Sequence, residues 1–96
     1  MFVQGIEASE EEVEHANELA ASTNLNMSIC FFLLQDYKKA LEKASISIKH
    51  KKTIKALYRR AKAYAMLSNY EKAIEDMTNA VKMDTSDPND IQQEML

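Results

Sequence analysis

Two basic side chains and one amide have the spacing of a small anion-binding site. Lys55 and Arg59 lie four residues apart, so they project from one face of any helix that contains them. Asn26 precedes Arg59 by 33 residues, which is also the period of an internal repeat. A guanidinium can bind a carboxylate through two hydrogen bonds, an ammonium supplies a compact charge, and a carboxamide can donate a further hydrogen bond. The spacing therefore predicts that Asn26, Lys55 and Arg59 lie on one surface, as a set of groups that suits carboxylates. From spacing alone, the alternative is that Lys55 and Arg59 belong to a solvated helix face.

The internal repeat is found when the sequence is aligned with itself at that interval, which places residues 35–42 over residues 68–75. Identical aligned pairs include Tyr37/Tyr70, Lys39/Lys72, Ala40/Ala73, Glu42/Glu75 and Lys49/Lys82. A two-helix unit that occurs twice predicts two stacked helix hairpins. In such a stack the first helices of the hairpins line the concave side, where the three candidate residues converge.

The pattern of apolar residues and caps predicts an all-α fold. Ser9 and Glu12 have the spacing of a capping box, Thr53 can cap a helix, and Asp87 before Pro88 is a typical helix start. Helices are expected at 10–34, 37–49, 53–67 and 70–83, with a fifth beginning at Asp87. The residues expected in the core are Leu25, Ile29, Cys30, Phe31, Leu33, Leu34, Ala40, Leu41, Ala44, Ile48, Ala56, Leu57, Ala61, Tyr64, Ala73, Ile74, Met77, Ala80 and Val81, together with Tyr37, Tyr70, Met27 and Met66.

The amino-acid composition and the missing motifs exclude several classes of fold and functional site. The 96 residues include one Gly, one Pro and one Cys, which argues against a turn-rich β fold and excludes an internal disulfide framework and a Cys-based zinc site. The sequence contains no Gly-rich phosphate loop and no nucleophile paired with a base. We therefore expect no catalytic residues, no metal and no cofactor. The absence of a secretory signal and of a long apolar run predicts a cytoplasmic protein without a membrane span.

Charge is segregated along the chain, with an acidic beginning, a basic middle and an acidic end. Residues 37–62 hold ten Lys or Arg and one acid, whereas residues 1–36 hold seven acids and no Lys or Arg. A basic segment at 49–62 raises nucleic-acid binding as an alternative. The pI of about 5.3 argues against it, as does the lack of interleaved aromatic residues apart from Tyr58. Within the basic segment, Lys51, Lys52 and Arg60 are expected to be solvated.

The recurring pattern of small residue, aromatic residue and Tyr-x-x-Ala over residues 21–86 resembles the tetratricopeptide repeat. The resemblance implies a right-handed superhelix of antiparallel helix hairpins, with two full repeats and the start of a capping helix. It divides a single domain or fragment, residues 1–96, into a lead-in (1–8), a hairpin with an extended first helix (9–49), a second hairpin (53–83) and the capping segment (87–96). Gln35 and Ser68 stand where the family usually has Gly at the hairpin turn.

Residues 25–30 and 55–61 further resemble the last two repeats of co-chaperone domains of the carboxylate-clamp type, most closely those of large FKBP-type immunophilins. This resemblance implies that Asn26, Lys55 and Arg59 hold the C-terminal Glu-Glu-Val-Asp tail of the ninety- or seventy-kilodalton heat-shock chaperones. Ser22 and Lys52 would be secondary peptide contacts. The parent protein would carry a peptidyl-prolyl isomerase domain outside this chain.

The clamp of that family also takes a Lys and an Asn from a preceding repeat, which this chain does not contain. The expected clamp is therefore partial, and the 96 residues are expected to be a fragment of a longer protein. The alternative is a structural scaffold that contacts other proteins or associates with itself through the incomplete stack.

Overall fold

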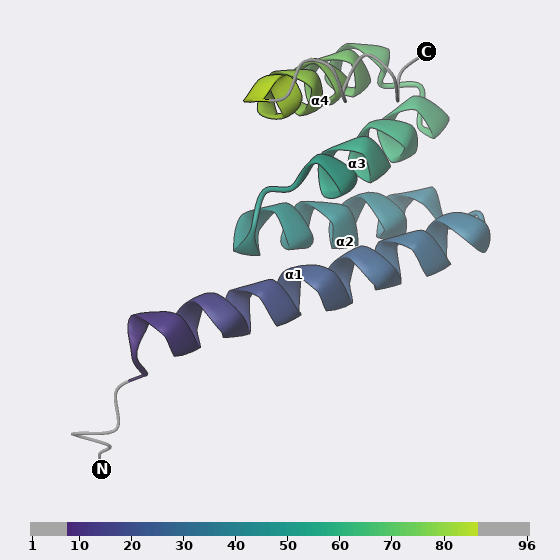
Figure 1. The fold of residues 1–96 in the computed structure, drawn as a ribbon. Helices are drawn as coiled ribbons and strands as arrows, with labels where there is room; N and C mark the ends of the chain where they lie inside the picture. Colours follow the sequence, from purple (N-terminus) through teal and green to yellow (C-terminus); the bar gives the residue numbers. More distant parts are fainter. Residues whose placement is uncertain (1–7, 87–96) are drawn as a thin grey trace.

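The computed structural model describes residues 8–86, which form four antiparallel helices stacked in chain order (Figure 1). These are α1 (Glu10–Leu33), α2 (Tyr37–His50), α3 (Ile54–Met66) and α4 (Tyr70–Met83), followed by a 3-10 turn at Asp84–Ser86. The expected all-α fold of helix hairpins is confirmed, and each expected boundary within residues 8–86 agrees to within one residue. The helix expected from Asp87 onward lies outside the described residues.

Each helix begins at a side chain that accepts a hydrogen bond from a free backbone N–H group. The capping box is present, because Glu12 N donates to Ser9 Oγ at 3.1 Å and Ser9 N donates to Glu12 Oε1 at 2.9 Å. Thr53 Oγ1 accepts from Ala56 N at 3.1 Å. The caps of the remaining two helices, which are Asp36 on α2 and Asn69 on α4, correspond to each other in the repeat.

The two hairpin turns have the same backbone conformation. Gln35 and Ser68 both have left-handed backbones, with φ of 64° and 65°. In the first turn Asp36 N donates to Phe31 O at 2.9 Å, and in the second Asn69 N donates to Tyr64 O at 2.8 Å. These are the long-range bonds of a Schellman motif, which favours glycine at the left-handed position. The two hairpin turns therefore repeat in backbone geometry as well as in sequence position.

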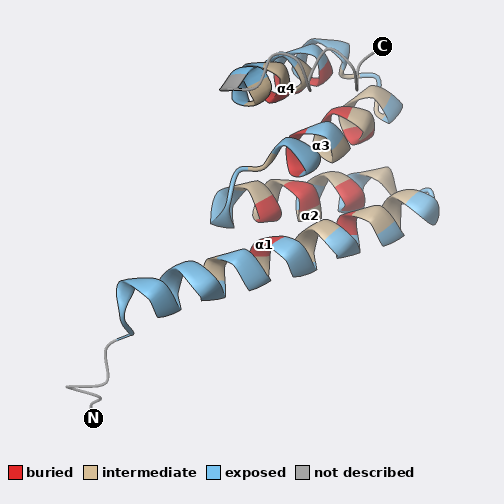
Figure 2. Ribbon diagram, in the orientation of Figure 1, coloured by how far each residue is buried: buried red, intermediate tan, exposed pale blue. Residues whose placement is uncertain are grey.

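Small side chains fill most of the interface between helices. Ala40, Ala44, Ala56 and Ala63 are 0% exposed, and Leu57 is 1% exposed. Figure 2 shows that the buried residues are concentrated where α2 and α3 meet their neighbours. Alanine removes side-chain volume from the contact, so the helix axes can approach closely. The core is therefore a set of close helix contacts instead of one large apolar cluster.

Several residues expected in the core are exposed instead. They are Met27, Cys30, Leu33, Leu34, Met66, Tyr70 and Ile74. The expectation of a core thiol at Cys30 is wrong, and Leu33 and Leu34 keep about three quarters of their surface, at 75% and 74%. For the residues of the first and last helices the physical reason is position in the stack, because α1 and α4 are its outer layers and each packs against described helices on one side only (Figure 1). Met66 is different, because it is the last residue of α3 and lies next to the hairpin turn.

The first helix extends beyond the others. α1 has 24 residues against 14 in α2, a difference of about 15 Å at 1.5 Å per residue. The first turns of α1 project past the end of α2 and are exposed (Figures 1 and 2). We call residues 10–18 the overhang. Among residues 8–86, none of the helices combines the length and hydropathy that crossing a bilayer requires.

Candidate functional site

Two adjoining grooves lie between α1 and α3. The first has a volume of about 400 Å³, and its lining includes Ser22 and Asn26 from α1 and Lys55 from α3. The second has a volume of about 320 Å³ and is lined by Leu25, Ile29, Lys55, Tyr58 and Arg59. Leu25, Ile29 and Lys55 line both grooves. We therefore treat them as one surface, the α1–α3 groove.

The groove receives its polar groups from single turns of two helices. Asn26 lies one turn after Ser22 on α1, and Arg59 lies one turn after Lys55 on α3, so each pair shares a helix face. The structure thus brings Asn26, Lys55 and Arg59 to one surface together with Ser22. Lys52 is different, because it is exposed in the loop between α2 and α3 and lines neither part of the groove.

The two groove cations are available to a ligand. Lys55 is exposed and Arg59 is half-buried, and within residues 8–86 neither forms an ion pair, since the two ion pairs there join other residues. Beside them lie the apolar side chains of Leu25 and Ile29. A surface of this kind can bind carboxylates through the cations while it covers an apolar side chain of the same ligand.

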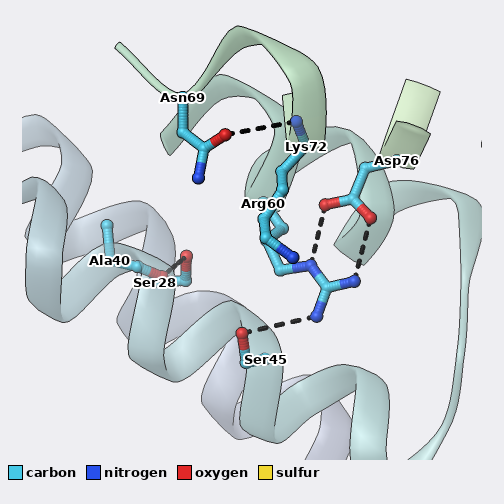
Figure 3. A network of polar contacts seen from close by, with 7 residues as sticks. All are labelled: Ser28, Ala40, Ser45, Arg60, Asn69, Lys72 and Asp76. Carbon is cyan, nitrogen blue, oxygen red and sulfur yellow. Dashed lines mark hydrogen bonds and ion pairs between the residues drawn. The ribbon is translucent and has the colours of Figure 1, made fainter. Parts of the chain in front are cut away.

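Arg60, the neighbour of Arg59, has a structural role. Its Nε donates to Asp76 Oδ2 at 2.7 Å and its Nη2 donates to Asp76 Oδ1 at 2.8 Å, while Nη1 reaches Ser45 Oγ at 3.4 Å (Figure 3). The hydrogen bond with Asp76 raises the pKa of Arg60 above its ordinary value. The expectation that Arg60 is solvated is therefore wrong, because the side chain joins α3 to α4 and α2.

An ion pair lies in the lining of the same groove. Lys51 Nζ donates to Glu18 Oε2 at 2.7 Å, and both side chains are about half exposed. This hydrogen bond lowers the pKa of Glu18 and raises the pKa of Lys51. Because the two charges offset each other, the positive charge of the groove comes from Lys55 and Arg59. Lys51 was expected to be solvated, and it remains accessible although it is paired.

Several residues of this site are not predicted by the sequence patterns, among them Tyr58, which lines the groove together with Arg59. Leu25 and Ile29 were assigned to the core, although they also line the groove. No role is predicted for Glu18 from the sequence patterns. A signal for it was present, because Glu18 and Lys51 carry opposite charges at the 33-residue interval of the repeat.

Comparison with known proteins supports the repeat in the second hairpin. Residues 54–87 match the family model of the tetratricopeptide repeat. No solved structure matches the chain. The matched segment contains α3 and α4, and with them both groove cations, Lys55 and Arg59. The second hairpin therefore resembles a tetratricopeptide repeat, a kind of repeat that serves as a scaffold for protein–protein interaction.

Proposed function

We propose that the α1–α3 groove binds the acidic C-terminal tail of a partner protein, with Asn26, Lys55 and Arg59 holding its carboxylates. The observation that carries the proposal is the contrast between neighbouring arginines. Arg60 is engaged by Asp76, whereas Arg59 lines the groove and has no ion-pair partner within residues 8–86. A terminal aspartate suits this surface because it offers two carboxylates to two cations and one amide.

The free energy of a single polar contact is too small to hold a peptide, so binding requires all three polar residues. One exposed ion pair contributes about 0–1 kcal/mol, which is too little for a complex. Hydrogen bonds to charged groups contribute about 1.5–3 kcal/mol each. Three of them, with an apolar side chain against Leu25 and Ile29, approach the roughly 8 kcal/mol of a micromolar complex. The groove therefore has the groups for modest affinity and specificity for a free carboxyl end.

The partner that we propose is a heat-shock chaperone of the ninety- or seventy-kilodalton class, whose tail ends in Glu-Glu-Val-Asp. The resemblance of residues 25–30 and 55–61 to co-chaperone domains supports this choice. In this role the chain is a binding module and no enzyme, and any peptidyl-prolyl isomerase activity belongs to a domain outside it. Ser22, which lines the groove beside Asn26, is the secondary peptide contact that we retain.

The proposal is tested with a peptide that ends in Glu-Glu-Val-Asp, compared with the same peptide carrying a C-terminal amide. Calorimetry should give at least about tenfold weaker binding for the amide and for the Arg59→Ala, Lys55→Ala and Asn26→Ala variants, since each loses a charge-assisted hydrogen bond. Lys49→Ala is the matched control, because Lys49 is exposed on α2 and lines neither part of the groove. Equal affinity for both peptides refutes the proposal.

A structural scaffold is the second candidate, and the exposed apolar residues of the outer helices favour it. Ile74 on α4 is 66% exposed and lines a further groove with Tyr58 and Met77. A scaffold role predicts that the chain binds a partner equally well after Lys55 and Arg59 are both replaced by alanine. Loss of partner binding in that double variant supports the carboxylate-binding role instead.

A further inference from the structure

An exposed and mostly apolar stripe runs along the outer side of α1 and ends at Leu34, the C-cap of the helix. We call it the outer stripe, and it consists of Leu19, Thr23, Met27, Cys30 and Leu34. Intervals of four, four, three and four residues place the five side chains on one helix face. Leu19 is 56% exposed, Met27 37% and Leu34 74%, and Thr23 and Cys30 are also exposed. The side toward α2 is different, because Ala21 and Ser28 there are buried and contact α2.

The repeat identifies the outer stripe as a helix-packing face. Thr23 and Cys30 correspond, 33 residues later, to Ala56 and Ala63 on α3. Both alanines are 0% exposed, and α3 packs directly against α2 of the preceding hairpin. α1 therefore presents outward the face that α3 buries, and within residues 8–86 nothing covers it.

The stripe also has nearly the same order of side-chain sizes in both directions. Leu19 and Leu34 form its ends, the smaller Thr23 and Cys30 lie inside them, and Met27 lies near the centre. If two copies of α1 lie antiparallel, each end leucine meets the opposite end leucine of the other copy. Thr23 then faces Cys30, and the two Met27 side chains meet. This is the self-complementarity that a twofold interface requires, with the same surface on both subunits.

The charges favour the same arrangement. The overhang contains five glutamates and no Lys or Arg. Glu18 is paired with Lys51 of the same chain, so the other four glutamates carry the negative charge of the overhang. In an antiparallel pair it extends past the hairpin turn of the other copy, where Lys38 and Lys39 are exposed at the start of α2. Lys39 is held at that end of the hairpin, with its ammonium 5.5 Å from the centre of the Phe31 ring. A parallel pair would instead place two acidic overhangs side by side, and like charges repel.

We propose that this face binds a second copy of the chain, forming an antiparallel dimer through α1. Analytical ultracentrifugation of the full 96-residue chain should show a concentration-dependent dimer. Met27→Glu should raise its dissociation constant by at least about tenfold, because dimerisation would bury two carboxylates side by side. Met66→Glu is the matched control, since Met66 is an exposed methionine on α3 away from the stripe. Helix content by circular dichroism should be unchanged in both variants, since neither position is buried in the monomer.

Disulfide cross-linking tests which residues of the two α1 helices lie opposite each other in the proposed dimer. In the proposed dimer the two Cys30 side chains are offset by seven residues, or about 10 Å along the axis, which is too far for a disulfide. The native chain should therefore resist oxidative cross-linking. Thr23→Cys should form a covalent dimer through Cys30 of the other copy, and Cys30→Ser in the same chain should abolish it. A chain that stays monomeric at high concentration overturns the proposal, as does equal cross-linking with and without Thr23→Cys.

Discussion

Asp76 on α4 binds Arg60 on α3 through both of its carboxylate oxygens, at 2.7 and 2.8 Å, while only 2% of its side chain remains exposed. The first hairpin has no such pair, because Met27 and Lys43 occupy the corresponding positions. It is joined by two buried hydroxyls instead. Ser28 Oγ donates to Ala40 O and Ser47 Oγ donates to Ala21 O, both at 2.7 Å. The two hairpins therefore share their turn geometry but are stabilised by different polar contacts. The second hairpin uses a buried ion pair, and the first uses hydrogen bonds from serine hydroxyls.

Replacing Arg60 should destabilise the fold more than replacing Arg59. Arg60→Met leaves the Asp76 carboxylate buried without its partner, which should lower the free energy of unfolding by about 3 kcal/mol. Arg59→Met is the matched control and should change it by less than about 0.5 kcal/mol, because Arg59 has no ion-pair partner within residues 8–86. Urea denaturation measures both values. The double variant Arg60→Met/Asp76→Leu should recover most of the loss, and a double variant as unstable as Arg60→Met would contradict this account.

Glycine at the hairpin turns should stabilise the protein. Ser68→Gly and Gln35→Gly should each raise the free energy of unfolding by about 0.5–1 kcal/mol, since a left-handed backbone is strained for a residue with a Cβ atom. Thermal unfolding followed by circular dichroism measures the gain. Ser68→Ala is the control, because it keeps the Cβ atom and should give no gain. Lower stability in both glycine variants would show that these turns are not strained.

The buried serine hydroxyls should each contribute measurable stability. Ser28→Ala and Ser47→Ala remove a hydrogen bond between α1 and α2, which should lower the free energy of unfolding by about 1 kcal/mol each. Alanine should fit both sites, because the corresponding residues of the second hairpin, Ala61 and Ala80, are buried alanines. Ser22→Ala is the exposed control. Urea denaturation in which all three variants behave alike would rule out a role for these bonds.

The ion pair between Glu18 and Lys51 should make stability depend on pH at both extremes. The pKa of Glu18 is lowered in the folded state, so its contribution is present above the unfolded pKa and is lost as the pH falls through the folded value. The pKa of Lys51 is raised, so its contribution is lost as the pH rises through the folded value. NMR titration of Glu18 should show its pKa returning to the ordinary range in Lys51→Ala. If the pKa of Glu18 stays lowered in that variant, the ion pair with Lys51 is not the cause of the shift.

Local signals in the sequence determined the helices and their order. Ser9, Glu12 and Thr53 mark helix starts through their own side chains, and the repeat interval aligns the two hairpins. Such signals act over a few residues, so they can be recognised without knowledge of the packing. The same interval led to the expectation that Asn26, Lys55 and Arg59 share one surface, and all three line the α1–α3 groove.

Only the tertiary structure decided which side chains are buried and which cations are engaged. Apolar periodicity marks a helix face but cannot tell whether another layer covers it, and for this reason Cys30, Leu34 and Ile74 were wrongly assigned to the core. Adjacent arginines have the same intrinsic chemistry, but they point about 100° apart around the helix. That rotation directs Arg60 to a buried carboxylate on α4 and Arg59 to the groove, and only the packing of α4 against α3 determines where Asp76 lies.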